Sequence, residues 1–446
     1  MANKPKVSFV SLGCPKNLVD SETILGKLLS AGSVLCEDPQ DSDVVIINTC
    51  CFIKEAEDES AKVINDAIKL KQDGFCKAVI VAGCMASRYG KALKSRFPDV
   101  DAVAGVWDKD SIVSACFSLH SREKNASSCN SPTPETMPAD SARLRLTPRH
   151  FAYIKIADGC NNKCSYCIIP GIRGSYKSKP LNAIAAEAGE LVRDGVVEAC
   201  LIAQDTTMYG ANLDAPADIV DAMAAACKAD FKWVRLLYAH PAHFNDKLIG
   251  FIAENKKAVK YIDLPVQHIS ANMLDKMNRH VSPEQVRKLI EKMRKNIKGL
   301  FIRTSIIVGF PGETEKDFGE LLEFLKEYRF ERLGAFAYSR EKGTRAYHFP
   351  GHLSEGEKNR RLDAVMKLQQ EIAFEQNKGL IGSVVDAIVD AKENGMYKCR
   401  TYGDAPEVDG TLFVKINKKN KLAPGDVFSA KITGFKEYDL TGEIYG

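Results

Sequence analysis

The chain has 446 residues, 45% of them apolar, which is enough for about three domains with sizeable cores. Its formal net charge of +4 is small for this length and argues against a strongly basic nucleic-acid-binding protein. The first apolar run is too short for a signal peptide, and no stretch reaches the length of a membrane span. We therefore expect a cytoplasmic protein without a membrane partner, whose 14 cysteines serve metal binding or catalysis rather than disulfides.

Residues 1–118 alternate between short apolar runs and helical patterns, which predicts a parallel α/β domain. The apolar runs are 7–12, 44–48, 79–82 and 102–106. Residues 119–148 have the Ser- and Pro-rich composition of a linker, in which we expect Cys129 to be an exposed, unliganded thiol.

Residues 149–378 also alternate between strand and helix patterns. The six candidate strands are 151–158, 198–205, 233–238, 261–265, 301–309 and 333–339. Six β/α units suggest an open, partial version of the eight-fold barrel, although periodicity alone also allows a doubly wound sheet.

A long helix then begins with a capping box, Ser354 and Glu357, and is expected to stop at Gly379. Residues 379–446 contain about five short strands separated by Gly, Asp and Asn turns, which predicts a small all-β barrel of oligonucleotide-binding size. The fold class is therefore α/β, with an all-β barrel at the carboxyl end.

Three cysteines in the segment CNNKCSYC, namely Cys160, Cys164 and Cys167, directly follow the first strand of the middle domain. Thiolates favour zinc or iron–sulfur clusters, and α/β folds bind ligands at the carboxyl ends of their strands. A four-iron cluster held by three cysteines keeps one iron free to bind a substrate. The alternative is a zinc loop that a histidine completes.

Three further cysteines, Cys14, Cys50 and Cys84, each follow a successive strand of the first domain, so their thiols can converge at one sheet edge. We expect Gly13 and Gly83 to let a bulky cluster approach the backbone. The alternatives are buried structural cysteines or a reactive Cys50–Cys51 pair. We expect the remaining cysteines to pack as small apolar residues: Cys36, Cys76, Cys116, Cys200, Cys227 and Cys399.

The CxxxCxxC spacing, with Tyr166 before the last cysteine, resembles the signature of the radical S-adenosylmethionine enzymes. From residue 7 to 446 the chain resembles the methylthiotransferases of that superfamily. The stretches that carry the resemblance are SLGCPKNLVDSE, NTC, AGCM, CNNKCSYCIIPGIRGSY, DLPVQHIS, RTSIIVGFPGET and DAPEVDG.

This resemblance implies two 4Fe–4S clusters, S-adenosylmethionine as cofactor, and a C-terminal TRAM domain. It assigns an auxiliary cluster to Cys14, Cys50 and Cys84, and the radical-generating cluster to the other triad. Cys51 stands where many members carry glycine, so an exchange between Cys50 and Cys51 stays open.

SLGCPKNLVDSE and DAPEVDG resemble the branch that modifies an aspartate of a ribosomal protein, which implies the twelfth small-subunit protein as partner, free or within the ribosome. One S-adenosylmethionine would supply the methyl group. A second, cleaved with an electron from a donor, would supply the radical that abstracts hydrogen from the β-carbon. Radical chemistry is required because this carbon–hydrogen bond offers no acidic proton.

Weaker candidates for holding S-adenosylmethionine are polar residues of the middle domain, which could equally form salt bridges within the barrel. They are Tyr166, Glu198, Gln204, Asp205 and Arg303. GFPGET (309–314) either shapes an adenine pocket or is simply a turn, and His268 is expected to be hydrogen-bonded rather than a metal ligand.

Residues 380–446 contain nine Lys plus Arg and ten Asp plus Glu, which suits a basic protein partner better than transfer RNA. The basic run 416–421 fits a solvated turn, and the side chains expected to face the partner are Tyr402, Asp404, Glu407 and Asp409. The alternatives are the same chemistry on a transfer-RNA adenosine, and a non-catalytic zinc or iron–sulfur protein that binds RNA.

Overall fold

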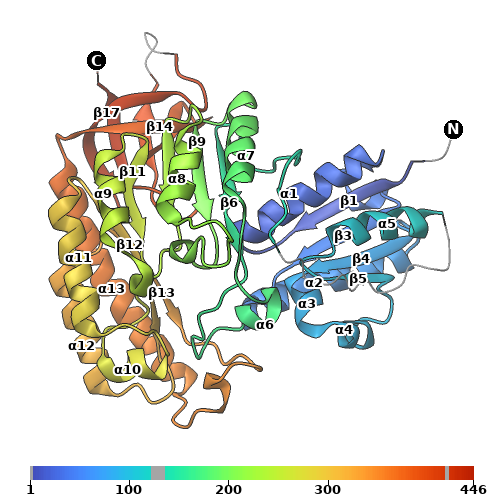
Figure 1. Ribbon diagram of the computed structural model, residues 1–446, viewed down its shortest axis with the longest axis horizontal. Helices are drawn as coiled ribbons and strands as arrows, with labels where there is room; N and C mark the ends of the chain where they lie inside the picture. Colours follow the sequence, from blue (N-terminus) through green and yellow to red (C-terminus); the bar gives the residue numbers. More distant parts are fainter. Residues whose placement is uncertain (1–3, 122–135, 417–420, 446) are drawn as a thin grey trace.

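Three β-sheet systems follow one another along the chain (Figure 1). The computed structural model describes residues 4–121, 136–416 and 421–445. The expectations for Cys129 and for most of the basic run 416–421 lie outside these residues. In the parts of the chain that are described, no helix is both long and apolar enough to cross a membrane.

The first sheet has five parallel strands in the order β2-β1-β3-β4-β5. Its strands are β1 (Lys6–Ser11), β2 (Val34–Leu35), β3 (Val44–Thr49), β4 (Ala78–Gly83) and β5 (Ala102–Ala104). Its helices are α1 (Pro15–Ser30), α2 (Lys54–Gln72), α3 (Cys84–Tyr89), α4 (Lys91–Arg96) and α5 (Lys109–His120). The strand order reverses between β1 and β3, and open α/β sheets bind their ligands at such a switch point.

The middle sheet confirms the partial barrel and excludes the doubly wound alternative, because its six parallel strands lie side by side in sequence order. These strands are β6 (Phe151–Lys155), β9 (Glu198–Ile202), β10 (Trp233–Leu236), β11 (Ala258–Asp263), β12 (Phe301–Val308) and β13 (Arg332–Ala337). The first predicted strand is divided, since β7 (Ala157–Asp158) leaves the sheet and pairs with β8 (Lys177–Ser178).

Helices cover the outer face of this open barrel and enclose its largest apolar core (Figure 1). The helices that contribute to this core are α7 (Leu181–Arg193), α8 (Ile219–Cys227), α9 (Asp246–Glu254), α11 (Pro283–Asn296), α12 (Glu315–Tyr328) and α13 (Glu355–Leu380). The short helix α6 (Ile169–Arg173) packs on the first domain beside α3, and α10 (Ala271–Lys276) packs in a smaller cluster with Phe310. Short 3₁₀ turns are η1 (Pro39–Asp41), η2 (Thr206–Met208), η3 (Pro241–His243) and η4 (Ala346–His348).

The predicted start of α13 is confirmed in part. The Ser354 hydroxyl accepts a hydrogen bond from the Glu357 amide, but the Glu357 carboxylate pairs with Arg360 and Arg361 rather than closing a capping box. After this helix, five strands form a closed barrel in the order β14-β15-β16-β18-β17. They are β14 (Val384–Glu393), β15 (Met396–Thr401), β16 (Leu412–Lys415), β17 (Val427–Lys436) and β18 (Asp439–Ile444).

The C-terminal barrel packs on the amino-terminal edge of the middle sheet through buried charges. Glu198, the first residue of β9, is fully buried and accepts hydrogen bonds from Arg235 and Arg400, each at 2.7 Å. Arg400 also binds Asp390 at 2.8 Å, and Asp390 in turn contacts His150. A buried carboxylate is tolerated when it is paired in this way.

The prediction that the DAPEVDG side chains face a partner is wrong for Asp404 and Asp409. Asp404 is 1% exposed and pairs with Arg332, while the carboxylate of Asp409 accepts a hydrogen bond from the Tyr261 hydroxyl at 2.6 Å. Both carboxylates therefore neutralise charge or satisfy donors of the middle sheet.

The other two DAPEVDG candidates are also bonded to the middle domain. The Tyr402 hydroxyl donates to the carbonyl of Gly299 at 3.0 Å. Glu407 is exposed, yet it accepts a hydrogen bond from Tyr153 at 2.7 Å. Glu407 is thus the one carboxylate of this segment that remains open to solvent.

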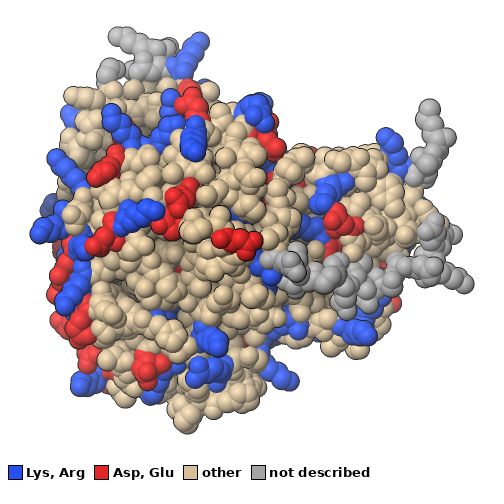
Figure 2. Space-filling model, in the orientation of Figure 1, with Lys and Arg blue, Asp and Glu red and all other residues tan. Residues whose placement is uncertain are grey.

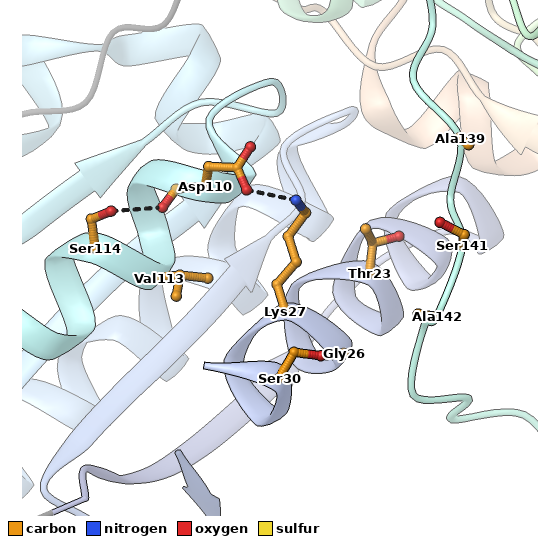
Figure 3. Close-up of a pocket in the computed structure, with 10 residues that line it drawn as sticks. All are labelled: Thr23, Gly26, Lys27, Ser30, Asp110, Val113, Ser114, Ala139, Ser141 and Ala142. Atoms are coloured by element: carbon orange, nitrogen blue, oxygen red, sulfur yellow. Dashed lines mark hydrogen bonds and ion pairs between the residues drawn. The ribbon is translucent and has the colours of Figure 1, made fainter. Parts of the chain in front are cut away.

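The first domain meets the middle domain through a second set of buried charges, here called the ion network. Its members are Asp20, Lys109, Asp140, Lys155, Asp158, Arg173, Lys179 and Glu187. Asp140 belongs to residues 136–148, which pack along α1 and do not form an unpacked linker. A Cβ on Gly26 would lie 2.2 Å from the Ala142 carbonyl, so only glycine allows this approach (Figure 3).

Acidic and basic side chains are interspersed over the face drawn in Figure 2. The pocket in Figure 3 lies between α1, α5 and residues 139–142, and no cysteine lines it. Neither feature marks a site for chemistry among the described residues.

We predict that Glu198→Gln destabilises the full chain by about 3–5 kcal/mol, because it removes the carboxylate that compensates two buried guanidinium groups. Thermal unfolding measures the loss. The matched control is Asp110→Asn, which breaks an exposed pair with Lys27 and should lower the midpoint far less. Equal midpoints for the two variants would contradict the structural role of Glu198.

Acid should weaken the ion network. Burial alone would raise the pKa of Asp20, but Lys109, Lys155 and Arg173 hold it below its usual value. A carboxyl group whose pKa is lowered by folding stabilises the protein above its unfolded pKa of about 4, and this stabilisation is lost as pH falls through the folded value. We expect the melting temperature to drop below about pH 4, and Asp20→Asn to start lower at neutral pH and drop less steeply. Parallel curves for the two proteins would count against this.

Candidate active site

The first cysteine triad lies at the carboxyl ends of three adjacent strands. Cys14 precedes α1, Cys50 directly follows β3, and Cys84 is the first residue of α3, directly after β4. Because β1, β3 and β4 are neighbours in the sheet, the three cysteines meet at one edge, at the switch point of the strand order. The structure therefore brings together the residues predicted to hold the auxiliary cluster.

The two glycines of this site have a different role from the one predicted. Gly13 (φ +89°) makes room for a neighbouring ligand candidate, since a Cβ there would lie 2.6 Å from the Cβ and 2.8 Å from the sulfur of Cys50. A Cβ on Gly83 (φ +87°) would lie 2.2 Å from Asn48 Oδ1. Both glycines thus let the loops pack on one another, which is what brings the cysteines close.

Side chains beneath the triad fix these loops. Asn17 and Asn48 exchange hydrogen bonds, the Asn17 amide donating to the Asn48 carbonyl at 3.3 Å and the Asn48 amide to the Asn17 carbonyl at 3.0 Å. Ser60 of α2 accepts from the Cys50 amide at 3.0 Å and donates to its carbonyl at 2.7 Å. Cys50 therefore sits on a backbone that is held from two sides.

The neighbouring residue Cys51 has different surroundings from Cys50. It is fully buried in an apolar cluster that includes Val81, Met85 and also Cys84, whereas Cys50 packs against Gly13. Burial raises the pKa of the Cys51 thiol well above that of an exposed cysteine. This geometry favours Cys50 over Cys51 as the ligand.

The second triad lies on the loop after β7. Its turn is closed by a hydrogen bond from the Cys167 amide to the Cys164 carbonyl at 3.1 Å. Ser165 anchors the loop to the end of α10, donating through its amide to Met277 and through its hydroxyl to Lys276. The loop is thus fixed by the barrel and not only by a bound group.

Arg279 organises this loop from the far side. It lies 3.4 Å from the Cys164 sulfur and 3.3 Å from the Tyr166 hydroxyl. The ring of Tyr166 packs against a cluster that includes Phe310 and Tyr338. This places Tyr166 in a supporting role, and its contact with S-adenosylmethionine stays a prediction.

The thiols differ in their readiness to ionise. Burial raises the pKa of Cys84 and of Cys167 to about 12, and that of Cys160 to about 11. Burial also acts on Cys14, but the positive charges of Lys16 and Arg173 outweigh it and lower the pKa of that thiol. Thiolate ligands must lose their protons, so a metal bound here would release protons on binding.

Neither cysteine triad, among the described residues, gathers all three sulfur atoms within 4.8 Å of one another. Among the described residues, only Asp205, His240 and His243 bring three metal-binding atoms within 4.8 Å of one another. A tetrahedral zinc ion would need its sulfurs about 3.8 Å apart. Three thiols in each triad are the donor set that a 4Fe–4S cluster with one open iron uses.

The Asp205 group is a hydrogen-bonded cluster rather than a vacant ion site. One Asp205 oxygen accepts from the amide and hydroxyl of Thr207, and the other contacts Asn162 and His243, each at 2.8 Å. Asn162 belongs to the CNNKCSYC loop. Asp205 therefore ties that loop to the end of β9.

Of the weaker candidates, Gln204 has the geometry that best fits a ligand. It follows the carboxyl end of β9, donates to Asp158 at 2.9 Å, and leaves its buried Oε1 without a partner among the described residues. This oxygen can accept a hydrogen bond from an ammonium or hydroxyl group of a ligand. Its contact with S-adenosylmethionine stays a prediction.

Glu198 and Arg303 lie in the amino-terminal halves of their strands, away from the cysteine loop. Glu198 is paired as described above, and Arg303 contacts Asp263 at 3.3 Å and Asp409 at 3.4 Å. The structure gives both residues a stabilising role, and their predicted contact with S-adenosylmethionine stays a prediction.

His268 is hydrogen-bonded, as predicted. Its ring lies 3.1 Å from Glu313, and its Nδ1 accepts from two backbone amides, those of Ile269 and Ser270. In GFPGET, Gly309 and Gly312 both have positive φ, so the segment is a tight turn. A contact of this turn with adenine stays a prediction.

Sequence reasoning missed three cations that join the first triad to the middle domain. Lys16 lies 3.2 Å above the ring of Tyr238, and Arg88 binds Glu341 at 3.0 Å. Arg173 lies 3.6 Å from the sulfur of Cys84. Only Arg173 had a signal in the sequence, since it stands six residues after Cys167 in the stretch CNNKCSYCIIPGIRGSY, which carries the family resemblance.

Three family models match the chain in succession. They are the "Uncharacterized protein family UPF0004" over residues 6–105, the Radical SAM superfamily (SAM, S-adenosylmethionine) over 154–325 and the TRAM domain over 381–444. Among solved structures, TsrM from Kitasatospora setae, a radical S-adenosylmethionine methyltransferase, matches with a TM-score of 0.54 at 13% identity, covering 89% of this chain and 77% of that one. At such low identity this likeness shows the fold alone.

Curated relatives match over nearly the full length. The ribosomal protein uS12 methylthiotransferase RimO of Trichlorobacter lovleyi is 41% identical, covering 99% of this chain and 98% of its own. The protein of the same name from Geobacter sulfurreducens is 42% identical, covering 99% of each. With both cysteine triads in place and these matches end to end, the chain belongs to the RimO family of radical SAM methylthiotransferases, enzymes that use S-adenosylmethionine and 4Fe–4S clusters.

Proposed function

We propose that this enzyme adds a methylthio group to the β-carbon of an aspartate of ribosomal protein uS12. The observation that carries the proposal is the end-to-end identity of 41–42% with enzymes named for that reaction. The near-neutral C-terminal barrel supports a protein substrate over transfer RNA, because phosphate contacts would require a basic surface. The enzyme would act in the cytoplasm, on free uS12 or on the ribosome, with an electron donor.

Each cysteine triad has its own task in this proposal. Cys160, Cys164 and Cys167 would hold the cluster that binds S-adenosylmethionine, and Cys14, Cys50 and Cys84 would hold the auxiliary cluster. When bound, the first cluster supplies the electron that cleaves S-adenosylmethionine, and the second carries the sulfur to be transferred. The division into 1–118, a linker 119–148, 149–378 and 379–446 belongs to the same proposal.

Residues around the triads would hold the cysteine loops and the first domain in place for this reaction. Arg279 holds the Cys164 loop in place, and Gln204 offers an unpartnered acceptor beside it. Lys16 and Arg88 hold the first domain against Tyr238 and Glu341, which follow the carboxyl ends of β10 and β13. The auxiliary triad is thereby kept at the open end of the barrel, where the substrate carbon must enter.

Deleting the gene should remove one methylthio group from a single aspartate of uS12, and intact mass spectrometry of the small-subunit proteins measures this. Re-expression of the wild-type chain should restore it, and Cys84→Ala should not. If uS12 is unchanged while a transfer-RNA nucleoside loses its methylthio group, the substrate assignment is wrong although the chemistry stands.

Iron content distinguishes Cys50 from Cys51. We expect Cys51→Ala to keep about eight irons per chain after anaerobic reconstitution, and Cys50→Ala to fall to about four, because a three-cysteine site that loses one thiolate holds its cluster poorly. The Cys51→Ala protein is the matched control, since it removes a neighbouring buried thiol of the same size. The reverse pattern would move the ligand assignment to Cys51.

A further inference from the structure

Arg173 contacts a cysteine of the first triad and the aspartate that leads into the loop of the second. It ends α6, just beyond the CNNKCSYC loop, and its side chain is 1% exposed. Its Nη2 lies 3.6 Å from the Cys84 sulfur in the first domain. Its Nη1 donates to both oxygens of Asp158, at 3.0 and 2.8 Å. Asp158 stands two residues before Cys160, so one guanidinium group links Cys84 to the start of the second cysteine loop.

The position of this guanidinium group is fixed from several directions. Nη1 also contacts Asp20 of α1 at 3.1 Å, and Nη2 contacts the side-chain oxygen of Asn17 at 3.4 Å. Asp158 accepts in addition from the Gly159 amide at 2.9 Å, which ties the carboxylate to the start of the cysteine loop. Only the planar fork of an arginine can satisfy a thiol and two carboxylates in this arrangement.

The contact with Cys84 has an electrostatic consequence. Hydrogen bonds to the sulfur atoms of an iron–sulfur cluster stabilise its reduced, more negative form and raise its reduction potential. Asp20 and Asp158 offset much of the net charge of Arg173, so the effect on Cys84 comes mainly from the N–H group directed at its sulfur. Lys109 shares the same ion network but contacts Asp20 and Asp140.

We propose that Arg173 is a positioning residue that couples the two cysteine sites, holding their loops in a fixed relation and raising the reduction potential of the cluster on Cys14, Cys50 and Cys84. The inference rests on the proposed function, in which these three cysteines hold that cluster. It adds a residue that neither touches the substrate nor serves as a ligand.

The test measures the reduction potential of the auxiliary cluster alone. The parent protein is the full chain in which Cys160, Cys164 and Cys167 are replaced by alanine, so that only one cluster can be bound. Arg173→Gln and Arg173→Lys are compared with the parent by a potentiometric titration followed by electron paramagnetic resonance. We expect Arg173→Gln to shift the potential to a more negative value. Arg173→Lys should shift it in the same direction by less, because an ammonium group cannot reach the thiol and both carboxylates together.

The matched control is Lys109→Gln, which removes a cation from the same network without a contact to sulfur, and its potential should stay close to that of the parent. An equal shift in Lys109→Gln would overturn the proposal, since the charge of the network rather than Arg173 would then set the potential. If Arg173→Gln does not retain iron, Arg173→Lys decides, and an unchanged potential there overturns the proposal as well.

A second readout uses the enzyme with all six cysteines. Arg173→Lys should still cleave S-adenosylmethionine, but the methylthiolated product per 5′-deoxyadenosine should fall several-fold as the two sites lose their fixed relation. An unchanged ratio would contradict the coupling. A parent protein that binds no iron at Cys14, Cys50 and Cys84 would instead refute the proposed function, so the two failures are distinguishable.

Discussion

The arrangement of this enzyme depends on a set of charges that are buried between its first two domains. Four cations and four carboxylates alternate there: Lys109, Lys155, Arg173 and Lys179 with Asp20, Asp140, Asp158 and Glu187. Burying one such charge alone would cost several kcal/mol, whereas a complete set is tolerated. Because any displacement of the first domain would leave charges unpaired, the network admits one orientation of the two domains. That orientation places Arg173, which follows the second cysteine loop, against Cys84 of the first triad.

The two ends of the middle sheet are used differently. At the amino-terminal edge, Glu198 and Arg303 form ion pairs with residues of the C-terminal barrel or of neighbouring strands. These ion pairs stabilise the packing of the domains. At the carboxyl edge lie the cysteine loop, Gln204 and Tyr238, which face the first domain. Barrel enzymes place their active sites at this carboxyl edge, since loops there can vary without disturbing the strands. Charged residues at the amino-terminal ends of the strands thus stabilise the fold, and the candidate site residues lie at the carboxyl ends.

The sequence was sufficient for the order of the strands and for the convergence of Cys14, Cys50 and Cys84, because each cysteine directly follows a short apolar run and parallel strands share one carboxyl edge. It was insufficient where a side chain meets a partner far along the chain. Glu198 and Asp404 lie 202 and 72 residues from their arginine partners, and no local pattern announces such pairs. The contact of Arg173 with Cys84 could not be predicted either, because the two residues are 89 positions apart, although Arg173 stands beside a recognisable motif.

The structure distinguishes Cys50 from its neighbour Cys51 as a ligand candidate, which the periodicity of the sequence cannot do. The two residues are consecutive, yet Cys50 lies against Gly13 while Cys51 lies in an apolar cluster with Val81, Met85 and Cys84. Gly13 lacks a side chain where Cys50 needs space, and the hydrogen bonds of Ser60 hold the backbone of Cys50. Cys51 is left among apolar side chains, where ionisation of a thiol is disfavoured. The packing of these two neighbours therefore favours Cys50 as the ligand of the proposed cluster, because Cys50 lies against Gly13 of the Cys14 loop.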